Sequence, residues 1–143
     1  MKIDICFYNE DVNYVLVSKQ KIRSWLSQVI EQEQKELGRV SYIFCSDNYL
    51  LTMNRQYLKA SYFTDVITFD YTEGRVISGD VFISVDRVKE NAKFYQQRYF
   101  QEMLRVILHG ILHLCGYKDK TAQEIKQMRE KEDYYLQKFD LVN

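Results

Sequence analysis

Short stretches in the first half of the chain alternate hydrophobic with polar residues or are rich in β-branched and aromatic ones. Residues 2–7 read Lys, Ile, Asp, Ile, Cys, Phe, and this period of two is typical of a half-buried strand. Three further stretches have a composition that favours strands; they are residues 40–45, 66–69 and 81–85. Glu73-Gly74, with a second glycine at Gly79, predicts a turn between the last two. The pattern therefore predicts about four strands.

In the other segments apolar residues recur every three or four positions, as on the buried face of a helix. Ser18 is the candidate N-cap of a helix that we expect to reach about Leu37 and to be stopped by Gly38. Asp47 is the candidate cap of a second helix. Three more helices are predicted over residues 87–97, over residues 101–114, and from the capping box Thr121–Glu124 to about Phe139. One side of the last helix carries Ile125, Met128, Glu132 and Leu136.

The order of these elements predicts the fold class. Strands come early and helices dominate the end, which is typical of an α+β fold with a small mixed sheet covered by helices. The chain has 143 residues, a length that suits one domain, since domains commonly have about 150 residues. We therefore expect a single domain over residues 1–143.

Composition and charge restrict the class of protein. With 46% hydrophobic and 15% aromatic residues, the chain lies far from disordered compositions. The 20 Lys and Arg balance the 20 Asp and Glu, which argues against a nucleic-acid module held by bulk positive charge but leaves room for a local basic patch. Three cysteines without a CxxC pair suit a reducing compartment. Because no apolar leader or membrane-length apolar run is visible, we expect a cytoplasmic protein without a membrane segment.

The two histidines of the chain, His109 and His113, both lie in the helix predicted over residues 101–114. Four residues turn a helix by about 400°, so both imidazoles leave the same face and can bind one metal ion such as Zn²⁺. Gly116 follows as a helix stop, and Asp119 is the nearest carboxylate after the turn. These residues predict a site of two His and one Asp with an open position for water. The alternative is that the histidines are hydrogen-bonded residues of a buried helix.

Position 110 distinguishes this pattern from a zinc-peptidase motif. In the sequence HExxH, a Glu after the first His is the general base. The chain has Gly110 at that place, so a peptidase of this type would lack its base.

The segment over residues 109–119, HGILHLCGYKD, resembles the signature HGxLHLxGYDH of the YbeY family of single-strand-specific metallo-endoribonucleases. Two more blocks support the resemblance, in the family's order and at its spacing. Residues 53–57 (MNRQY) followed by residues 64–69 (TDVITF) are similar to LNxx(F/Y)R…PTDVLSF, and residues 78–84 (SGDVFIS) resemble GDIxIS.

This resemblance implies a fold and a function. The fold would be that of a metzincin-like metal-dependent hydrolase, with one Zn²⁺ on a central helix. The activity would be cleavage of single-stranded RNA in maturation of the 3′ end of 16S rRNA and in ribosome quality control. The partners would be the 30S ribosomal subunit and ribosome-associated proteins. Four positions depart from the family's pattern. Asp119 stands in place of its third His ligand and Lys118 in place of the preceding Asp. Leu58 stands in place of an Arg, and Phe63 in place of the Pro before Thr64.

Three charged residues near the histidines are candidates for catalysis. Arg105 precedes His109 by four residues and shares its helix face, where it would offset phosphate charge or form a salt bridge to Glu102 or to a neighbouring acid. Glu102 would accept a hydrogen bond from an imidazole N–H or lie as a surface charge. Lys118 would meet a phosphate or be a solvated lysine of the turn.

Two other functions stay open. One is metal-dependent hydrolysis of another substrate such as a peptide, against which Gly110 argues. The other is a non-enzymatic ribosome assembly factor with a vestigial metal site, which the residues at Leu58 and Asp119 keep open.

Overall fold

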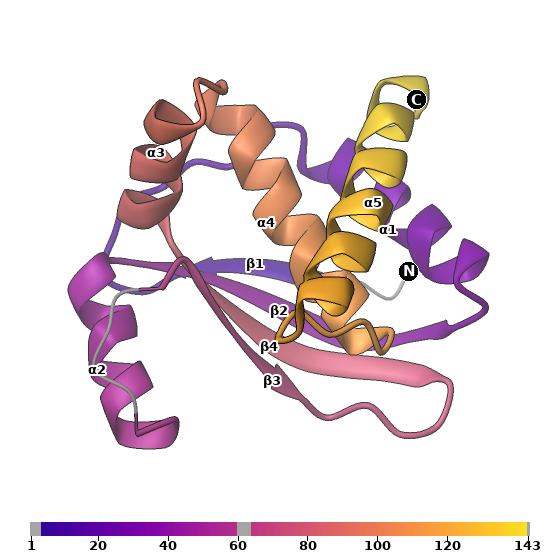
Figure 1. The fold of residues 1–143 in the computed structure, drawn as a ribbon, viewed down its shortest axis with the longest axis horizontal. Coiled ribbons are helices and arrows are strands. Elements are labelled where there is room, and N and C mark those ends of the chain that lie inside the picture. Colours follow the sequence, from indigo (N-terminus) through magenta and orange to yellow (C-terminus); the bar gives the residue numbers. More distant parts are fainter. Residues whose placement is uncertain (1–3, 60–63, 143) are drawn as a thin grey trace.

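The computed structural model describes residues 4–59 and 64–142. Four strands of this part form one mixed sheet (Figure 1). The strands are β1 (Ile5–Asn9), β2 (Glu36–Cys45), β3 (Val66–Asp70) and β4 (Val76–Ser84), in the spatial order β1-β2-β4-β3. Both β1 and β4 pair with β2 in parallel, whereas β3 pairs with β4 in antiparallel fashion. Strand β3 is therefore an edge of the sheet.

Five helices accompany the sheet in the described part of the chain. They are α1 (Lys19–Gln32), α2 (Asp47–Tyr57), α3 (Val85–Phe94), α4 (Tyr99–Leu114) and α5 (Ala122–Lys138), and a 3₁₀ turn, η1 (Phe139–Leu141), follows. Figure 1 shows α1, α3, α4 and α5 above one face of the sheet. Helix α2 packs on the opposite face through a small cluster of Leu50, Cys45 and Ile67. This arrangement is the α+β fold with a four-stranded mixed sheet that the sequence predicts.

Helix α4 lies at the centre of the helical layer, where it contacts β3, β4, α1, α3 and α5. A Cβ atom on Gly110 would lie 2.9 Å from Val81 Cγ1 on β4, so glycine permits the close approach of α4 to the sheet. The buried hydroxyl of Tyr42 on β2 donates a hydrogen bond to the Ile107 carbonyl at 2.7 Å. The helix that carries both histidines is thus held firmly against the strands.

The predicted extent of the first helix is wrong at its end. Helix α1 ends at Gln32, five residues before Leu37, and Gly38 lies inside β2. The buried apolar positions of α1 stop at Ile30, and a Cβ on Gly38 would lie 2.8 Å from the Ile77 carbonyl oxygen of β4. Glycine is therefore required at position 38 because two strands pair closely there. This contact is distant in sequence, so the sequence alone makes Gly38 look like a helix stop.

Smaller differences concern caps and element ends. Ser46, rather than Asp47, caps α2, because its hydroxyl accepts a hydrogen bond from the Tyr49 amide at 3.1 Å. Ser18 occupies the N-cap position of α1 without a side-chain cap bond. Helix α3 begins at Val85 and ends at Phe94, so the strand predicted over 81–85 loses its last residue to this helix.

Other predicted elements are confirmed. The capping box of Thr121 and Glu124 starts α5, and Gly116 has a φ of 110° just after α4. Strand β1 begins at Ile5, and of the strand predicted over residues 2–7 positions 2 and 3 lie outside the described residues. No helix in the described ranges is both long and apolar enough to cross a membrane.

Candidate functional site

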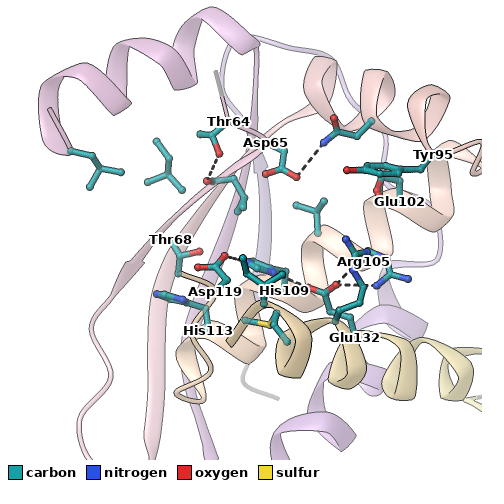
Figure 2. A pocket seen from close by; sticks show the side chains of 18 residues that line it. Thr64, Asp65, Thr68, Tyr95, Glu102, Arg105, His109, His113, Asp119 and Glu132 are labelled. Carbon is teal, nitrogen blue, oxygen red and sulfur yellow. Dashed lines mark hydrogen bonds and ion pairs between the residues drawn. The ribbon is translucent and has the colours of Figure 1, made fainter. Parts of the chain in front are cut away.

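A pocket of about 460 Å³ opens between the edge strand β3, helix α4 and helix α5 (Figure 2). Five of the six residues that the sequence singles out line it, namely Glu102, Arg105, His109, His113 and Asp119. The sixth, Lys118, is an exposed residue of the turn after α4 and does not line the pocket. The three predicted metal ligands therefore line one pocket, and Lys118, the predicted phosphate contact, lies outside its lining.

The turn after α4 explains how Asp119 returns to the histidines. The Gly116 amide donates to the His113 carbonyl at 3.0 Å, and the Tyr117 amide donates to the Leu112 carbonyl at 3.1 Å. These bonds satisfy the last carbonyls of the helix and reverse the chain at a residue with positive φ. Asp119 consequently faces the side of α4 that carries His109.

A partly buried carboxylate holds this turn from behind. Glu33, just after α1, accepts a hydrogen bond from the Tyr117 hydroxyl at 2.7 Å and another from the Tyr135 hydroxyl of α5. Lys131 Nζ lies 3.5 Å from the same carboxylate. Burial would raise the pKa of Glu33, but the hydrogen bonds from Tyr135 and Tyr117 and the charge of Lys131 outweigh it and lower the pKa below its ordinary value.

His109 is held by a carboxylate on each ring nitrogen. Its Nδ1 lies 2.8 Å from Glu132 Oε2, and its Nε2 lies 3.1 Å from Asp119 Oδ2. Figure 2 shows the two carboxylates on opposite sides of the ring. Burial would lower the pKa of His109, but the bond to Glu132 and the charges of Glu132, Asp119 and Asp65 raise it above the ordinary value.

The pair of His109 Nε2 and Asp119 Oδ2 fits a shared cation. When Nδ1 carries the proton of a neutral imidazole, Nε2 and a carboxylate oxygen are both acceptors, and they repel each other unless a positive charge lies between them. Either a proton on Nε2 or a metal ion can supply that positive charge. Two donor atoms bound at about 2.0–2.1 Å to one tetrahedral ion are about 3.3 Å apart, close to the observed 3.1 Å.

His113 lies one helical turn after His109 and lines the same pocket. Within residues 4–59 and 64–142, however, no three His, Cys, Asp or Glu side chains converge into a group ready to hold a metal ion. The observed pair therefore supplies two of the expected ligands, and the ligand role of His113 stays a prediction.

Arg105 forms two salt bridges to helix α5. Its Nη1 donates to Glu132 Oε1 at 2.9 Å and its Nη2 donates to Asp133 Oδ1 at 2.7 Å. Of the two interpretations that the sequence leaves open, the geometry matches the salt bridge to a neighbouring acid. The partners lie on α5, so Glu102 is not the residue that Arg105 binds.

Glu102 is buried in the pocket wall, with 7% of its surface exposed. Burial raises the pKa of Glu102 above its ordinary value, and the charge of Arg105 opposes this only in part. The imidazole contact that the sequence predicts for Glu102 is made by Glu132 instead. The physical reason is that α5 crosses α4 beside His109, whereas Glu102 lies two turns earlier on α4.

Three further pocket residues were not predicted from the sequence. Glu132 is the sharpest case, although its place on the apolar side of α5, between the buried Met128 and Tyr135, is a signal. Arg129, one turn earlier, also lines the pocket and has an exposed side chain. Its Nη1 lies 3.9 Å from Glu132 Oε1, which is a long contact for an ion pair. Asp65 lies just before β3, and burial raises its pKa above the ordinary value.

Comparisons with known proteins identify relatives over nearly the whole chain. The family model described as Endoribonuclease YbeY matches residues 7–140. An Endoribonuclease YbeY from Parabacteroides distasonis is 49% identical over 132 residues, which cover 92% of this chain and 93% of that protein. The protein of the same name from Cytophaga hutchinsonii is 49% identical over 133 residues, with equal coverage. The fold is similar to the solution structure of TM1509 from Thermotoga maritima, with a TM-score of 0.67, 27% identity, and coverage of 94% of this chain and 88% of that chain.

Proposed function

Because the chain belongs to the YbeY family of endoribonucleases, we propose that it is a zinc-dependent enzyme that cleaves single-stranded RNA in maturation of the 3′ end of 16S rRNA. Its partners in this proposal are the 30S subunit and ribosome-associated proteins, its place is the cytoplasm, and its wider role includes ribosome quality control. The observation that carries the chemical part is the His109–Asp119 pair, whose Nε2 and Oδ2 lie 3.1 Å apart, close to the separation of two atoms that bind one zinc ion.

The residues that would hold the zinc ion are His109, His113 and Asp119. A Zn²⁺ bound there would act as a Lewis acid on a phosphoryl oxygen and lower the pKa of a coordinated water. An aspartate is an accepted zinc ligand in place of a histidine, so the departure at Asp119 is compatible with the proposal.

The charge of the pocket supports a requirement for a metal ion. Its lining contains four carboxylates, on Asp65, Glu102, Asp119 and Glu132, against two guanidinium groups. Arg105 is already bound to two of the acids on α5. A phosphodiester would therefore meet a net negative surface, and a divalent cation would reverse that repulsion.

Other side chains of the pocket support binding of the phosphates and bases of an RNA. Arg129 is 54% exposed on its side chain, and its guanidinium has the geometry to contact a phosphate oxygen. The rim adds the exposed apolar surfaces of Leu58, Tyr95 and Ile125. Unpaired bases can stack on such surfaces, whereas the bases of a duplex are covered, which favours a single-stranded substrate.

Hydrolysis of a peptide is less well supported. The HExxH base is replaced by Gly110, and the space where its Cβ would lie is already limited by Val81. A non-enzymatic assembly factor would share the binding of the 30S subunit but not the cleavage, so an activity measurement separates it from the proposal.

The test begins with protein purified without a histidine tag, whose zinc content is measured. Cleavage is then followed on a single-stranded oligonucleotide with the 3′-terminal sequence of 16S rRNA and on the same RNA in a duplex. We expect one zinc ion per chain, as in sites with three protein ligands and an open position, and cleavage of the single strand alone.

Two variants serve as the comparison. His113→Ala should lose zinc and cleavage together, because it removes a ligand. Gln101→Ala, an exposed position of α4 away from the pocket, should retain both. If His113→Ala cleaves as fast as the wild type, the activity comes from a contaminant and the proposal fails. If the pure protein binds 30S subunits without cleaving RNA, the assembly-factor alternative replaces it.

A further inference from the structure

Glu132 is an ionisable residue on a helix face that is otherwise apolar. It lies between Met128 and Tyr135 on the buried side of α5, and only 5% of its surface is exposed. A buried carboxylate is costly unless it is paired and hydrogen-bonded. We therefore expect the Glu132 carboxylate to have specific partners in the pocket.

Each oxygen of this carboxylate has its own partner on α4. Oε2 lies 2.8 Å from His109 Nδ1, and Oε1 accepts a hydrogen bond from Arg105 Nη1 at 2.9 Å. A guanidinium has only donors, and an ionised carboxylate has only acceptors. Arg105 therefore fixes the carboxylate. The contact of Glu132 with the ring is shorter than that of Asp119, and its side chain is 6% exposed against 43% for Asp119. Because charges interact more strongly away from water, Glu132 holds the single proton of the neutral ring on Nδ1 in competition with Asp119.

We propose that Glu132 is a positioning residue that keeps the proton of neutral His109 on Nδ1, so that Nε2 presents its lone pair to the ion shared with Asp119. The ion itself belongs to the proposed function, on which this part of the inference rests. Arg105 supports the same role, because it holds Glu132 in place with Asp133 as its second anchor and does not contact the phosphate. Partners of this kind fix the tautomer of a metal-binding histidine and raise its basicity as a ligand.

The substitution Glu132→Gln tests this arrangement because it reverses the hydrogen bond between residue 132 and His109 Nδ1. Since Arg105 can only donate, the amide oxygen of the new side chain must face Arg105. The amide NH₂ then faces His109 and donates to Nδ1. The proton of the neutral imidazole moves to Nε2, which becomes a donor to Asp119 and is no longer a ligand.

The direct measurement is the ¹⁵N NMR spectrum of the imidazole rings in metal-free protein, at a pH alkaline enough to keep them neutral. Because the chain has two histidines, the variant His113→Gln leaves His109 as the single ring to assign. We expect the Nδ1–H tautomer with Glu132 and the Nε2–H tautomer in Glu132→Gln. Glu130→Gln, an exposed position on the same helix, is the matched control and should keep the wild-type tautomer.

Zinc affinity, measured by competition with a chromophoric chelator, gives the second readout. The loss of such a partner typically weakens metal binding about 10–100-fold, and we expect this loss in Glu132→Gln but not in Glu130→Gln. Glu132→Asp, which keeps the charge and the acceptors, should retain the Nδ1–H tautomer and lose less affinity.

The proposal can fail independently of the proposed function. An Nε2–H tautomer in the wild-type ring would overturn it without any variant at position 132, even if Glu132→Gln did not fold. An unchanged tautomer in folded Glu132→Gln would overturn it as well. The tautomer is read without metal or RNA, so a protein that shows the expected switch but neither binds zinc nor cleaves RNA refutes the proposed function and leaves the role of Glu132 intact.

Discussion

Replacing Gly110 with alanine measures how closely α4 must approach the sheet. The added Cβ would lie 2.9 Å from Val81 Cγ1 and 3.1 Å from Val81 Cγ2, below the 3.4 Å at which ordinary contacts begin. Helix or strand would have to move by about 0.5 Å, the difference between 3.4 and 2.9 Å. Because cores are packed as tightly as organic crystals, such a shift disturbs every contact of the helix.

Two opposing effects set the magnitude. Overpacking of a core costs about 1–3 kcal/mol, whereas alanine is favoured over glycine inside a helix by about 1 kcal/mol. The clash outweighs the gain in helix propensity, so Gly110→Ala should lower the free energy of unfolding by up to about 2 kcal/mol. In a Val81→Ala background both Cγ atoms are absent and the remaining Cβ lies at an ordinary 3.6 Å. There the same substitution should raise the free energy of unfolding by up to about 1 kcal/mol.

The assay is urea unfolding of the wild type, both single variants and the double variant. The signal is the fluorescence of Trp25, the one tryptophan of the chain and a buried residue. The change of sign between the two backgrounds corresponds to a coupling energy of about 1–3 kcal/mol, typical of residues in direct contact. Equal effects of Gly110→Ala in the two backgrounds would refute the idea that Val81 imposes the glycine.

Further outcomes follow from the pocket and its supports. Arg129→Gln should raise KM for single-stranded RNA and reduce the slope of log affinity against log salt by about 1. Lys126→Gln on the exposed side of α5 should change neither quantity. A KM of Arg129→Gln equal to that of the wild type would show that Arg129 does not contact a phosphate. Arg105→Gln should weaken zinc binding yet leave KM unchanged at saturating zinc, and a raised KM would instead place Arg105 on the substrate. Zinc at 100 times its dissociation constant should add about 2.7 kcal/mol to the free energy of unfolding, measured by urea titration, and His113→Ala should abolish most of that gain. Glu33 has a lowered pKa in the fold, so its contribution is complete above the pKa of the unfolded chain and is lost as pH falls through the folded value; Glu33→Gln should flatten the acid side of the stability profile, and an unchanged profile would contradict this.

Features with local causes could be predicted from the sequence. The helix with His109 and His113 follows from its apolar period, and its end follows from Gly116. The return of Asp119 to the histidines needs only the short turn that Gly116 begins. The alternating strands and the capping box of α5 are local signals of the same kind, and the structure confirms them.

Features set by distant contacts could not be predicted. Gly38 is required by the carbonyl of Ile77 on a neighbouring strand, so its local appearance as a helix stop is misleading. Glu132 meets His109 across 23 residues of sequence, and only the packing of α5 on α4 decides that it, rather than Glu102, binds the imidazole. A buried charge on an apolar helix face indicates that a partner exists but does not identify it.

The residues of the site are synthesised in a fixed order, because those on α5 follow those on α4 in the chain. A nascent chain translated as far as Asp119 already contains both histidines and the aspartate, and the sheet and α4 precede it in sequence. Glu132 and Arg129 follow afterwards, so the outer support of His109 and the exposed guanidinium of the pocket are added last. Since chains are made and begin to fold from the N-terminus, the pocket reaches its complete form only when the last helix has left the ribosome and docked.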